Sequence, residues 1–494
     1  MNLGWERIFA DFGGGQEGTR QQRLREILVA SIEDGKLVPG TRLPSSRSLM
    51  SILGVSRNTV VQALEQLIDS GHLVTRPRSG IFVAGSPALE TAVERPIAPP
   101  AAEERTEDWW AGTFAVMPSR LRHISKPADW NRYPYPFLFG QMDPTLFPTR
   151  EWRESARSVS SVAGIGLWAS DRIDEDDPKL IEQLRAHVLP RRGIWARQEE
   201  IMVTLGAQQA LSLVIRLLTG PETVFGVEDP GYPDARHMAQ LLTSHLRLLT
   251  VDGAGAMPDA RFAECDVAML TPGHQCPTTV AMSRERQVAT LEAARRHDIV
   301  LIEDDYDANL FDEGANVGTL KSLDRDGRVI HIGSFSKLIA PGLRIGYVVA
   351  PKRVIEELRV LRRLELRHPP LNNQRILASF IALGHYRAHM NRLGAIMLAR
   401  ARAMDSALAD HLPTCHAVRA QGATSAWVEL PPDVDATALV PHARREGVLI
   451  EAGDVFFAHK GRGTRHMRLG FTSIPEERIA AGIRRLNRMM NHQG

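Results

Sequence analysis

The chain has 494 residues, of which 43% are hydrophobic and 24% charged, a composition typical of a folded protein with more than one domain. Its formal net charge of +2 is too close to zero to indicate a nucleic-acid partner by itself. The apolar runs are too short to span a membrane, and the first residues lack the pattern of a secretory signal. The three cysteines are widely spaced and lack metal-ligand spacing, so we expect a cytoplasmic protein without a metal site.

The N-terminal region has the pattern of three short helices. Residues 20–34 carry apolar side chains at helical spacing. Residues 43–47 then provide a serine that can cap a short second helix, and Gly54 makes a tight turn. Ser56 can cap a third helix that runs to about Ser70. This order of helix, turn and helix is typical of a helix-turn-helix.

A β-hairpin is predicted to follow these helices. It spans Val74 to Val83 and turns at residues 77–80, so it can act as a wing that places Arg78 and Gly80 against a minor groove. The third helix exposes residues 56–59 in its first turn, where a helix-turn-helix places the side chains that contact base edges. The alternative is a small helical domain used only for docking.

The segments LPSSR, LGVSRNTV and RPRSG resemble the winged helix of the GntR family of regulators. The resemblance implies that the partner of this region is a double-stranded DNA operator. The DNA contacts that it implies are Arg47, Ser56, Arg57, Asn58, Thr59 and Gly80. We therefore expect a winged-helix DNA-binding domain over residues 17–85.

A change of composition separates this domain from the rest of the chain. Residues 85–105 are rich in Ala, Pro and Glu and show no periodicity, and we expect a linker over 86–130. Trp109, Trp110 and Phe114 indicate that part of the linker docks. From residue 131 to 494, apolar strand-like runs alternate with helical patterns, which predicts an α/β domain with a mainly parallel sheet.

Two strand ends in this domain are suited to a cofactor. Residues 204–209 form a glycine-containing turn that opens a helix, and the free backbone N–H groups of such a turn suit a phosphate. Residues 228–232 place Tyr232 on a Pro-Gly loop, where its ring can stack on a flat heteroaromatic ring. Taken alone, each has a structural alternative, since many strand-to-helix turns contain glycine and a tyrosine can simply cap the core.

A third strand end carries acids. Residues 300–306 form an apolar strand in which positions 304 and 306 point to the same side. Asp304 can bind the protonated ring nitrogen of pyridoxal phosphate, and Tyr306 can hold its phenolic oxygen. Ligands lie at the carboxyl ends of parallel strands in such sheets. A metal site is the competing interpretation, but the segment has no His ligand.

The fourth motif contains a lysine. Residues 329–337 form a strand that ends at Lys337, and only seven of the 60 basic residues are lysines. A lysine that forms a Schiff base must be partly desolvated or near another cation, so its placement here points to aldehyde chemistry. Ser334 and Arg344 would close on the phosphate of the cofactor, the arginine through two hydrogen bonds.

Together, these motifs resemble those of the fold-type I aminotransferases, and the whole chain resembles the MocR subfamily of GntR regulators. The stretches GQMDPTLFP, TLGAQQAL, VEDPGYP, TPGHQCPT, IEDDYD and SFSK carry the match. It implies pyridoxal 5'-phosphate as cofactor and Lys337 as the residue of the internal aldimine. The expected cofactor-binding residues are Lys337, Asp304, Tyr306, Tyr232, Gly206, Ala207, Gln208, Ser334, Ser336 and Arg344. Arg468 matches the arginine that holds the substrate carboxylate in aminotransferases, although a structural ion pair is equally compatible with its position.

The expected fold is a winged helix-turn-helix joined to a fold-type I aminotransferase-like domain. The expected function is transcriptional regulation in which an amine or amino-acid effector forms an external aldimine and domain closure alters operator binding. The resemblance implies a head-to-tail homodimer. A rival interpretation is an active aminotransferase with a DNA-binding appendage, but Cys276 replaces the Asn that aminotransferases carry, so we expect at most weak transaminase activity. A scaffold that has lost the cofactor and a regulator that senses the cofactor itself are two further hypotheses.

Overall fold

The computed structural model describes residues 5–9, 12, 19–77, 79–84, 107–307 and 318–491. The chain divides into two compact units, Met1–Ala115 and Val116–Gly494, called here the N-terminal unit and the large unit. No helix in these described ranges is long and apolar enough to cross a membrane.

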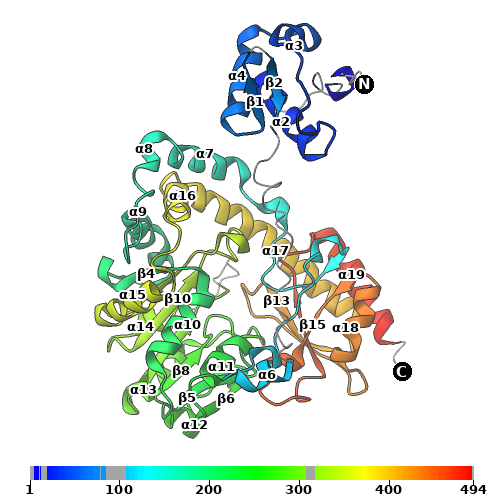
Figure 1. Cartoon of the computed structure of the whole chain (residues 1–494). Coiled ribbons are helices and arrows are strands. Elements are labelled where there is room, and N and C mark those ends of the chain that lie inside the picture. Colours follow the sequence, from blue (N-terminus) through cyan, green and yellow to red (C-terminus); the bar gives the residue numbers. More distant parts are fainter. Residues whose placement is uncertain are drawn as a thin grey trace. The chain divides into compact units, whose positions relative to one another are not determined.

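The N-terminal unit consists of short helices and one hairpin (Figure 1). Its elements are α1 (Trp5–Ile8), α2 (Arg20–Glu33), α3 (Ser46–Leu53), α4 (Arg57–Asp69), β1 (Leu73–Arg76), β2 (Gly80–Val83) and α6 (Glu107–Thr113). The strands pair antiparallel, with Arg76 opposite Gly80 and Leu73 opposite Val83. This arrangement confirms the predicted winged helix-turn-helix. Arg78, at the tip of the hairpin, lies outside the described residues.

Caps and apolar spacing explain where these helices begin and end. The Oγ of Ser45 accepts the Ser48 N–H at 3.2 Å, and the Oγ of Ser56 accepts the Thr59 N–H at 3.3 Å. Gly54 ends α3 in the left-handed conformation, with φ of 61°, which a residue without Cβ adopts at little cost. The core joins the inner faces of the three helices to the hairpin. It contains Leu24, Leu28, Leu49, Val60, Ala63, Leu64, Leu67, Leu73 and Val83.

The boundary between the units falls inside the segment that we expected to be a linker. Residues 86–106 lie outside the described residues, and α6 follows them. Trp109, Trp110 and Phe114 are the residues that we expected to dock part of the linker. They lie on and just after α6, and their side chains are 43%, 50% and 55% exposed. Residues 116–130 belong to the large unit, because Arg122 donates to Asp454 and to the carbonyls of residues 457 and 458.

The large unit is built on an eight-stranded sheet whose order is β4-β11-β10-β9-β8-β5-β6-β7. The strands are β4 (Ile201–Thr204), β5 (Phe225–Asp229), β6 (Leu246–Asp252), β7 (Gly255–Ala256), β8 (Val267–Leu270), β9 (Val300–Asp304), β10 (Val329–Ser334) and β11 (Gly346–Val349). The pairs β10–β9, β9–β8, β8–β5 and β5–β6 are parallel, whereas β11 runs antiparallel to both of its neighbours. The mainly parallel sheet predicted from the sequence is confirmed.

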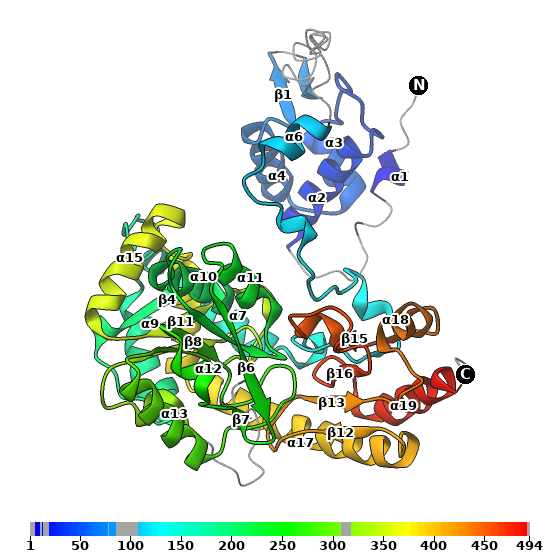
Figure 2. The same ribbon diagram turned by 90° about the horizontal axis from the view of Figure 1, so that it is seen from below.

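Helices cover both faces of this sheet (Figures 1 and 2). One face packs on α10 (Gly206–Leu218), α11 (Pro233–Gln240) and α15 (Lys352–Leu366). The other packs on α12 (Ala260–Ala263), α13 (Arg284–Arg296) and α14 (Leu320–Leu323). Alternate residues of each strand enter the two cores, which is why these strands are apolar almost throughout.

A second, smaller sheet begins after α17 (His385–His411) in the chain. Before it lie α7 (Thr149–Val159), α8 (Val162–Ile165), α9 (Pro178–Gln183), α16 (Leu371–Ala382) and the 27-residue α17. The small sheet has the order β12-β13-β16-β15, formed by His416–Val418, Ser425–Glu429, His466–Gly470 and Glu451–Ala452. Helices α18 (Ala436–Arg445) and α19 (Glu476–Met490) complete it, and β3 (Tyr135–Pro136) pairs with β14 (Val448–Leu449).

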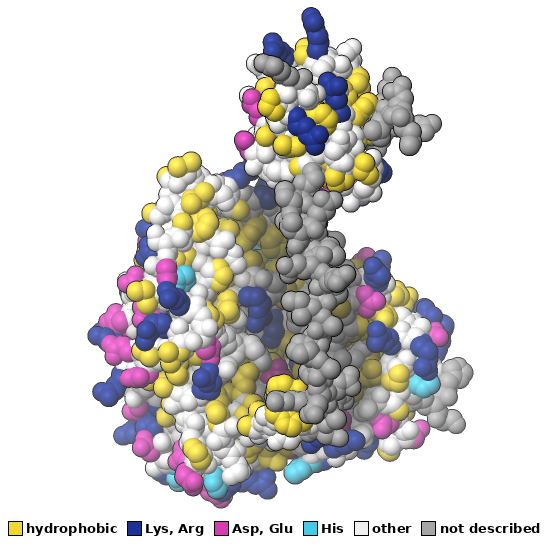
Figure 3. Space-filling model, in the orientation of Figure 1, with side chains coloured by type: hydrophobic (Ala, Val, Ile, Leu, Met, Phe, Trp, Pro, Cys, Tyr) yellow, Lys and Arg dark blue, Asp and Glu magenta, His cyan; other side chains and the backbone are white. Residues whose placement is uncertain are grey.

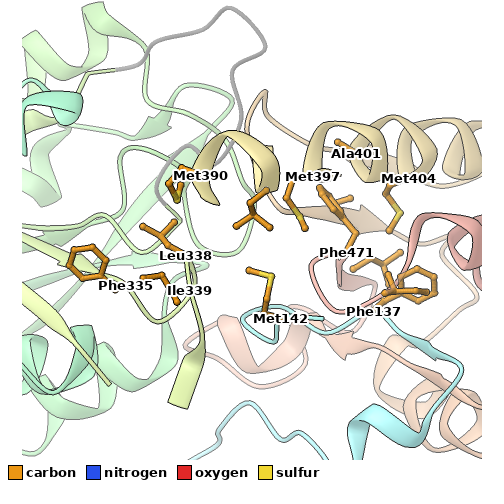
Figure 4. Packing of buried hydrophobic residues seen from close by; sticks show 14 of the residues in the cluster. Phe137, Met142, Phe335, Leu338, Ile339, Met390, Met397, Ala401, Met404 and Phe471 are labelled. Atoms are coloured by element: carbon orange, nitrogen blue, oxygen red, sulfur yellow. The ribbon is translucent and has the colours of Figure 1, made fainter. Parts of the chain in front are cut away.

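The largest hydrophobic cluster joins the two sheets along α17. In Figure 4, Met390, Met397 and Met404 follow one another along α17, with Leu338 near Met390 and Phe471 near Met397 and Met404. Because buried apolar contact is the main stabilising term in folding, this cluster fixes the small sheet against the ends of the large one. The functional pocket lies at this junction.

Candidate cofactor and DNA-binding sites

A cavity of about 400 Å³ opens at the carboxyl ends of the large sheet, next to the small sheet. All of the predicted cofactor and effector residues except Gly206 line it directly. The lining comprises His123, Ile124, Lys126, Phe139, Gly140, Ala207, Gln208, Leu211, Tyr232, Asp234, Cys276, Asp304, Tyr306, Ser334, Ser336, Lys337, Arg344 and Arg468. Residues from widely separated stretches of sequence therefore meet in one small volume.

Lys337 lies just beyond the end of β10, between two aromatic rings. Its Nζ is 4.2 Å from the centroid of the Tyr306 ring and 4.5 Å from that of Phe139. Burial lowers the pKa of Lys337 to about 8, and the nearby carboxylate of Asp304 opposes this shift. A substantial fraction of the amine is therefore neutral near physiological pH, which is what a nucleophilic lysine requires.

Asp304 is the last residue of β9 and is 4% exposed. Burial raises the pKa of its carboxyl to about 6, and Lys337 acts in the opposite direction. Its Oδ1 is buried and has no hydrogen-bond partner among the described residues. Because an unsatisfied buried carboxylate oxygen is costly, this atom suits a protonated ring nitrogen supplied by a ligand.

The two acidic residues that flank Asp304 are held in place by hydrogen bonds. Asp305 accepts two hydrogen bonds from Arg192, at 2.7 and 2.6 Å. Glu303 accepts the N–H groups of Leu320 and Lys321 at 2.6 and 3.1 Å. These bonds anchor the strand end in place, so only Asp304 of the three acids lines the cavity.

Hydrogen-bond donors gather where the start of α10 meets the cavity. Helix α10 begins at Gly206, and the residue before it, Leu205, provides no side-chain cap. The first N–H groups of this helix are therefore available for a ligand. Arg344 lies over this turn, donating from Nη2 to the Leu205 carbonyl at 3.1 Å. Ser336 is 8% exposed, and its Oγ has no partner among the described residues.

Tyr232 lines the cavity through a hydrogen-bonded group. Its hydroxyl lies 2.8 Å from Gln208 Oε1 and 3.1 Å from Asp234 Oδ2. Gln208 Nε2 also donates to Asp234 Oδ2, at 3.0 Å. Burial, followed by the charge of Asp234, raises the pKa of Tyr232, so its hydroxyl stays protonated as a donor. This triad positions the Tyr232 ring on the wall of the cavity.

Arg468, on β16, forms a buried ion pair rather than standing free. Its Nε donates to Glu451 Oε2 at 2.7 Å, and both side chains are almost fully buried. The other oxygen of Glu451 lies 3.1 Å from Lys126 Nζ. Burial favours the neutral carboxyl, but the two cations outweigh it and lower the pKa of Glu451. Glu451 is therefore a carboxylate shared by two basic side chains that line the cavity.

Sequence reasoning did not identify Lys126, Phe139 or Glu451. Lys126 falls in the segment we expected to be a linker, Phe139 lies outside the helices and strands, and Glu451 begins the two-residue strand β15. The rarity of lysine in this chain was a signal that applied to Lys126 as well as to Lys337. Cys276, which replaces the expected Asn, is 3% exposed, and its Sγ lies 3.8 Å from Arg468 Nη1.

In the N-terminal unit, the residues expected to contact DNA lie on the exposed starts of elements. Arg47 is in the first turn of α3 and Arg57, Asn58 and Thr59 form that of α4, with Ser56 as its cap. Thr59 is half-buried and bonds through its hydroxyl to Ser56, whereas the other predicted contacts are exposed. Gly80 begins β2 with φ of 111°, beside the guanidinium of Arg42, a residue outside the predicted contacts. Basic side chains protrude from this unit on the face seen in Figure 3.

Comparison with protein families assigns both units. Residues 20–83 match the bacterial regulatory proteins of the gntR family. Residues 173–486 match the aminotransferase class I and II family. The fold is also that of solved aminotransferases. LysN, the α-aminoadipate aminotransferase of Thermus thermophilus, was solved in complex with N-(5'-phosphopyridoxyl)-L-leucine. It is 28% identical, with a TM-score of 0.70 over 78% of this chain and 98% of its own.

Relatives that match most of the chain are regulators. The HTH-type transcriptional regulator TauR of Rhodobacter capsulatus is 38% identical over 99% of this chain and 100% of its own length. The probable rhizopine catabolism regulatory protein MocR of Rhizobium meliloti is 28% identical over 79% and 77% of the two chains. Because the two domains occur in the same order in one chain and the full-length relatives are HTH-type regulators, this protein belongs to the MocR-type transcriptional regulators of the GntR family.

Proposed function

We propose that this regulator binds pyridoxal 5'-phosphate in the cavity of the large unit and responds to an amine or amino-acid effector there. The observation that carries the proposal is the pairing of Lys337, with its lowered pKa, and Asp304, with its unsatisfied buried oxygen, in one cavity. Neither feature stabilises the protein by itself, since the Asp304 oxygen has no partner among the described residues and burial disfavours the charged form of Lys337.

The residues present fit this cofactor at each of its polar groups. Asp304 would hold the ring nitrogen, and Tyr306 the phenolic oxygen. The start of α10 would receive the phosphate, together with Ser334, Ser336 and Arg344. Tyr232 would lie against the ring. When bound, pyridoxal phosphate supplies an aldehyde that reacts reversibly with primary amines, and Lys337 is the amine placed to hold it.

The effector would act by competing with Lys337 for this aldehyde. A regulatory effect requires that the effector bind two arrangements of the protein with different affinity, and closure of the small sheet over the cavity is the change we propose. The N-terminal unit would bind operator DNA through the first turn of α4, with Arg57 as a principal contact. We further propose a head-to-tail homodimer, following the resemblance to the MocR subfamily.

The first test is an absorbance spectrum of the purified protein with added pyridoxal phosphate. Wild type should develop a visible band that borohydride fixes covalently to the peptide containing Lys337, and Lys337→Ala should not. A wild-type protein that stays colourless would refute cofactor binding.

The DNA-binding half is tested separately. In a gel shift with the promoter region next to the gene, Arg57→Ala should lose specific retention while its absorbance response to amines stays unchanged. Wild-type retention by Arg57→Ala would show that the recognition helix is wrongly placed.

The second candidate function is an active aminotransferase. It is favoured by the presence in one cavity of Lys337, Asp304, Tyr306 and Arg468. Cys276 in place of the expected Asn opposes it, because a buried neutral thiol, whose pKa burial raises to about 11, is a weak hydrogen-bond donor. Repeated conversion of an amino acid with an added keto acid would establish turnover. Conversion that stops after one equivalent would favour the regulator.

A further inference from the structure

The resemblance to aminotransferases implies that Arg468 holds an acidic group of the effector, and we propose that Lys126 is a second residue that contacts this group and selects for effectors that carry it. This inference deepens the proposed function and rests on it. It starts from the cluster of Lys126, Glu451 and Arg468, which lies beside the aldehyde-binding lysine. The cluster has two cations and one carboxylate, so it has one positive charge in excess.

The cluster is close enough to Lys337 for one small molecule to contact both. Both groups contact Phe139, with Lys337 Nζ 4.5 Å and the Arg468 guanidinium carbon 4.4 Å from its ring centroid. The surroundings of Gly140 also show that Lys126 and Lys337 lie close together. Both Lys126 Nζ and Lys337 Cε lie 3.7 Å from the position that a Cβ on Gly140 would occupy. A short molecule whose amine takes the place of the Lys337 amine therefore brings its other end to Lys126.

Contacts within the protein occupy only some of the N–H donors of Lys126 and Arg468. Arg468 donates from Nε to Glu451, and its Nη1 contacts the Cys276 thiol at 3.8 Å, a weak interaction. Lys126 donates to the Phe139 carbonyl and pairs with Glu451 Oε1. An ammonium has three N–H donors and a guanidinium five, so both cations keep donors for a ligand oxyanion. Glu451 fixes the two cations while cancelling only one of their charges.

The part of the cavity wall around Tyr232 and Asp234 does not offer such a place. Asp234 carries a negative charge there, and its Oδ2 accepts from Gln208 and lies beside the Tyr232 hydroxyl. An anionic group would be repelled from that wall and attracted to the cluster. A neutral or purely cationic amine would leave the excess charge of the cluster without a counter-ion, which is costly in a site of low dielectric constant.

The position of Lys126 in the chain gives this contact a regulatory consequence. Lys126 belongs to residues 116–130, the segment through which the chain enters the large unit after the N-terminal unit. Arg122 and Lys126 attach this segment to residues 451–458 of the small-sheet region. An acidic group bound at Lys126 therefore acts on the segment that leads directly to the DNA-binding unit. A plain amine would engage Lys337 without this contact.

The test compares amines that differ only in the acidic group. Protein loaded with pyridoxal phosphate is titrated with glycine, β-alanine and 4-aminobutanoate, and with the matching amino alcohols ethanolamine, 3-aminopropanol and 4-aminobutanol. The change in the visible absorbance band gives each dissociation constant. In wild type, the acid of the best-fitting length should bind at least about tenfold more tightly than its alcohol, as expected for a charged hydrogen bond.

Three variants assign the preference to Lys126. Lys126→Met should weaken binding of the acid about tenfold and leave that of the alcohol unchanged, because Glu451 keeps its bond from Arg468. Lys126→Arg should retain most of the preference. Lys352→Met, which removes an exposed lysine of α15 paired with Glu356, should bind both amines as wild type does. Thermal melting and the intensity of the band check that each variant is folded and loaded.

The outcomes separate this inference from the proposed function. Equal affinity for acids and alcohols at every length, or an equal loss for both in Lys126→Met, would overturn the role of Lys126 while leaving cofactor binding intact. A wild-type protein without a visible band would instead overturn the proposed function and this inference together. A preference for the acid that is lost in Lys126→Met and kept in Lys126→Arg supports the inference.

Discussion

At the scale of single residues, the cavity holds side chains whose charges are poorly matched by the protein itself. Burial lowers the pKa of Lys337 and raises that of Asp304, so both shifts favour the neutral forms. Each therefore costs stability relative to an exposed group. A cavity that holds such groups together is a typical functional site, because a ligand can satisfy both at once.

The pKa of Lys337 predicts how the rate of cofactor capture depends on pH. A lysine with a pKa of about 8 is mostly protonated below that pH and mostly neutral above it. The rate at which unloaded protein gains its visible band should therefore rise through pH 8 and level off above it, whereas free lysine continues to gain reactivity to about pH 10.4. Stopped-flow absorbance between pH 6.5 and 10.5 checks this. A rate that still rises steeply above pH 9.5 would contradict it.

Gly206 is a second residue with a defined expectation. It has φ of 77°, and an added Cβ would lie 3.1 Å from Arg344 Nη2, so Gly206→Ala must distort the turn or displace the guanidinium. We expect its dissociation constant for pyridoxal phosphate to rise at least about tenfold, a change of about 1.4 kcal/mol. Gly342→Ala is the matched control, since no atom of the described residues lies within 4 Å of its Cβ position and it should bind normally. Equal binding by both variants would argue against a phosphate at this turn.

At the scale of elements, two helix starts are used in different ways. Helix α4 is capped by Ser56, whereas α10 has no side-chain cap and begins at a glycine. A helix whose first N–H groups are capped is stable without a ligand, and one whose first N–H groups are free is suited to an anion. The difference follows from the residue at the cap position, which the sequence shows directly.

The caps of α3 and α4 make a matched pair for a test. Ser45→Ala and Ser56→Ala each remove one bond to an N3 backbone N–H, which costs about 1 kcal/mol of helix stability. Hydrogen exchange followed by mass spectrometry should show faster exchange in α3 for the first variant and in α4 for the second. Ser56→Ala should also weaken operator binding more than Ser45→Ala does, because Ser56 is itself a predicted DNA contact and α4 is the proposed recognition helix. Equal operator binding by the two variants would contradict that assignment.

At the scale of the whole molecule, contacts between distant parts of the sequence decide the shape of the large unit. Arg400 of α17 donates to Asp143 Oδ2 at 2.6 Å and to the Thr472 carbonyl at 2.9 Å. These bonds join the start of the unit, its longest helix and the residues that follow its last strand. Burial raises the pKa of Asp143, but bonds from Thr145 and Arg400 outweigh burial and lower it overall.

Breaking this pair should destabilise the large unit. Arg400→Met leaves a buried carboxylate without its main partner, which costs about 3–5 kcal/mol, and urea unfolding followed by circular dichroism measures the loss. Arg485→Met, which breaks the exposed pair with Glu446, should change the midpoint little. Because the folded pKa of Asp143 is lowered, the stabilisation is present at neutral pH and lost as the pH falls through that pKa. A wild-type midpoint for Arg400→Met at pH 7 would contradict this account.

The sequence by itself determined the order of domains, the fold class and most of the residues that line the cavity. Caps, turns and apolar periodicity are local signals, so α3, α4 and the hairpin could be placed from their own residues. Motifs at strand ends could be predicted to lie close together, because parallel strands place their carboxyl ends at one edge of a sheet. Asp304, Tyr306 and Lys337 meet for this reason.

Only the tertiary structure decided which further residues complete the site. Phe139 and Glu451 carry no local signal, and Lys126 carries only the rarity of lysine in this chain. The three residues meet because packing along α17 brings the small sheet and residues 116–130 to the edge of the large sheet. The pairing of Arg468 with Glu451 also depends on the antiparallel register of β15 and β16, which places these two residues opposite each other. Long-range packing sets such contacts, and their energies are not encoded in any short stretch of sequence.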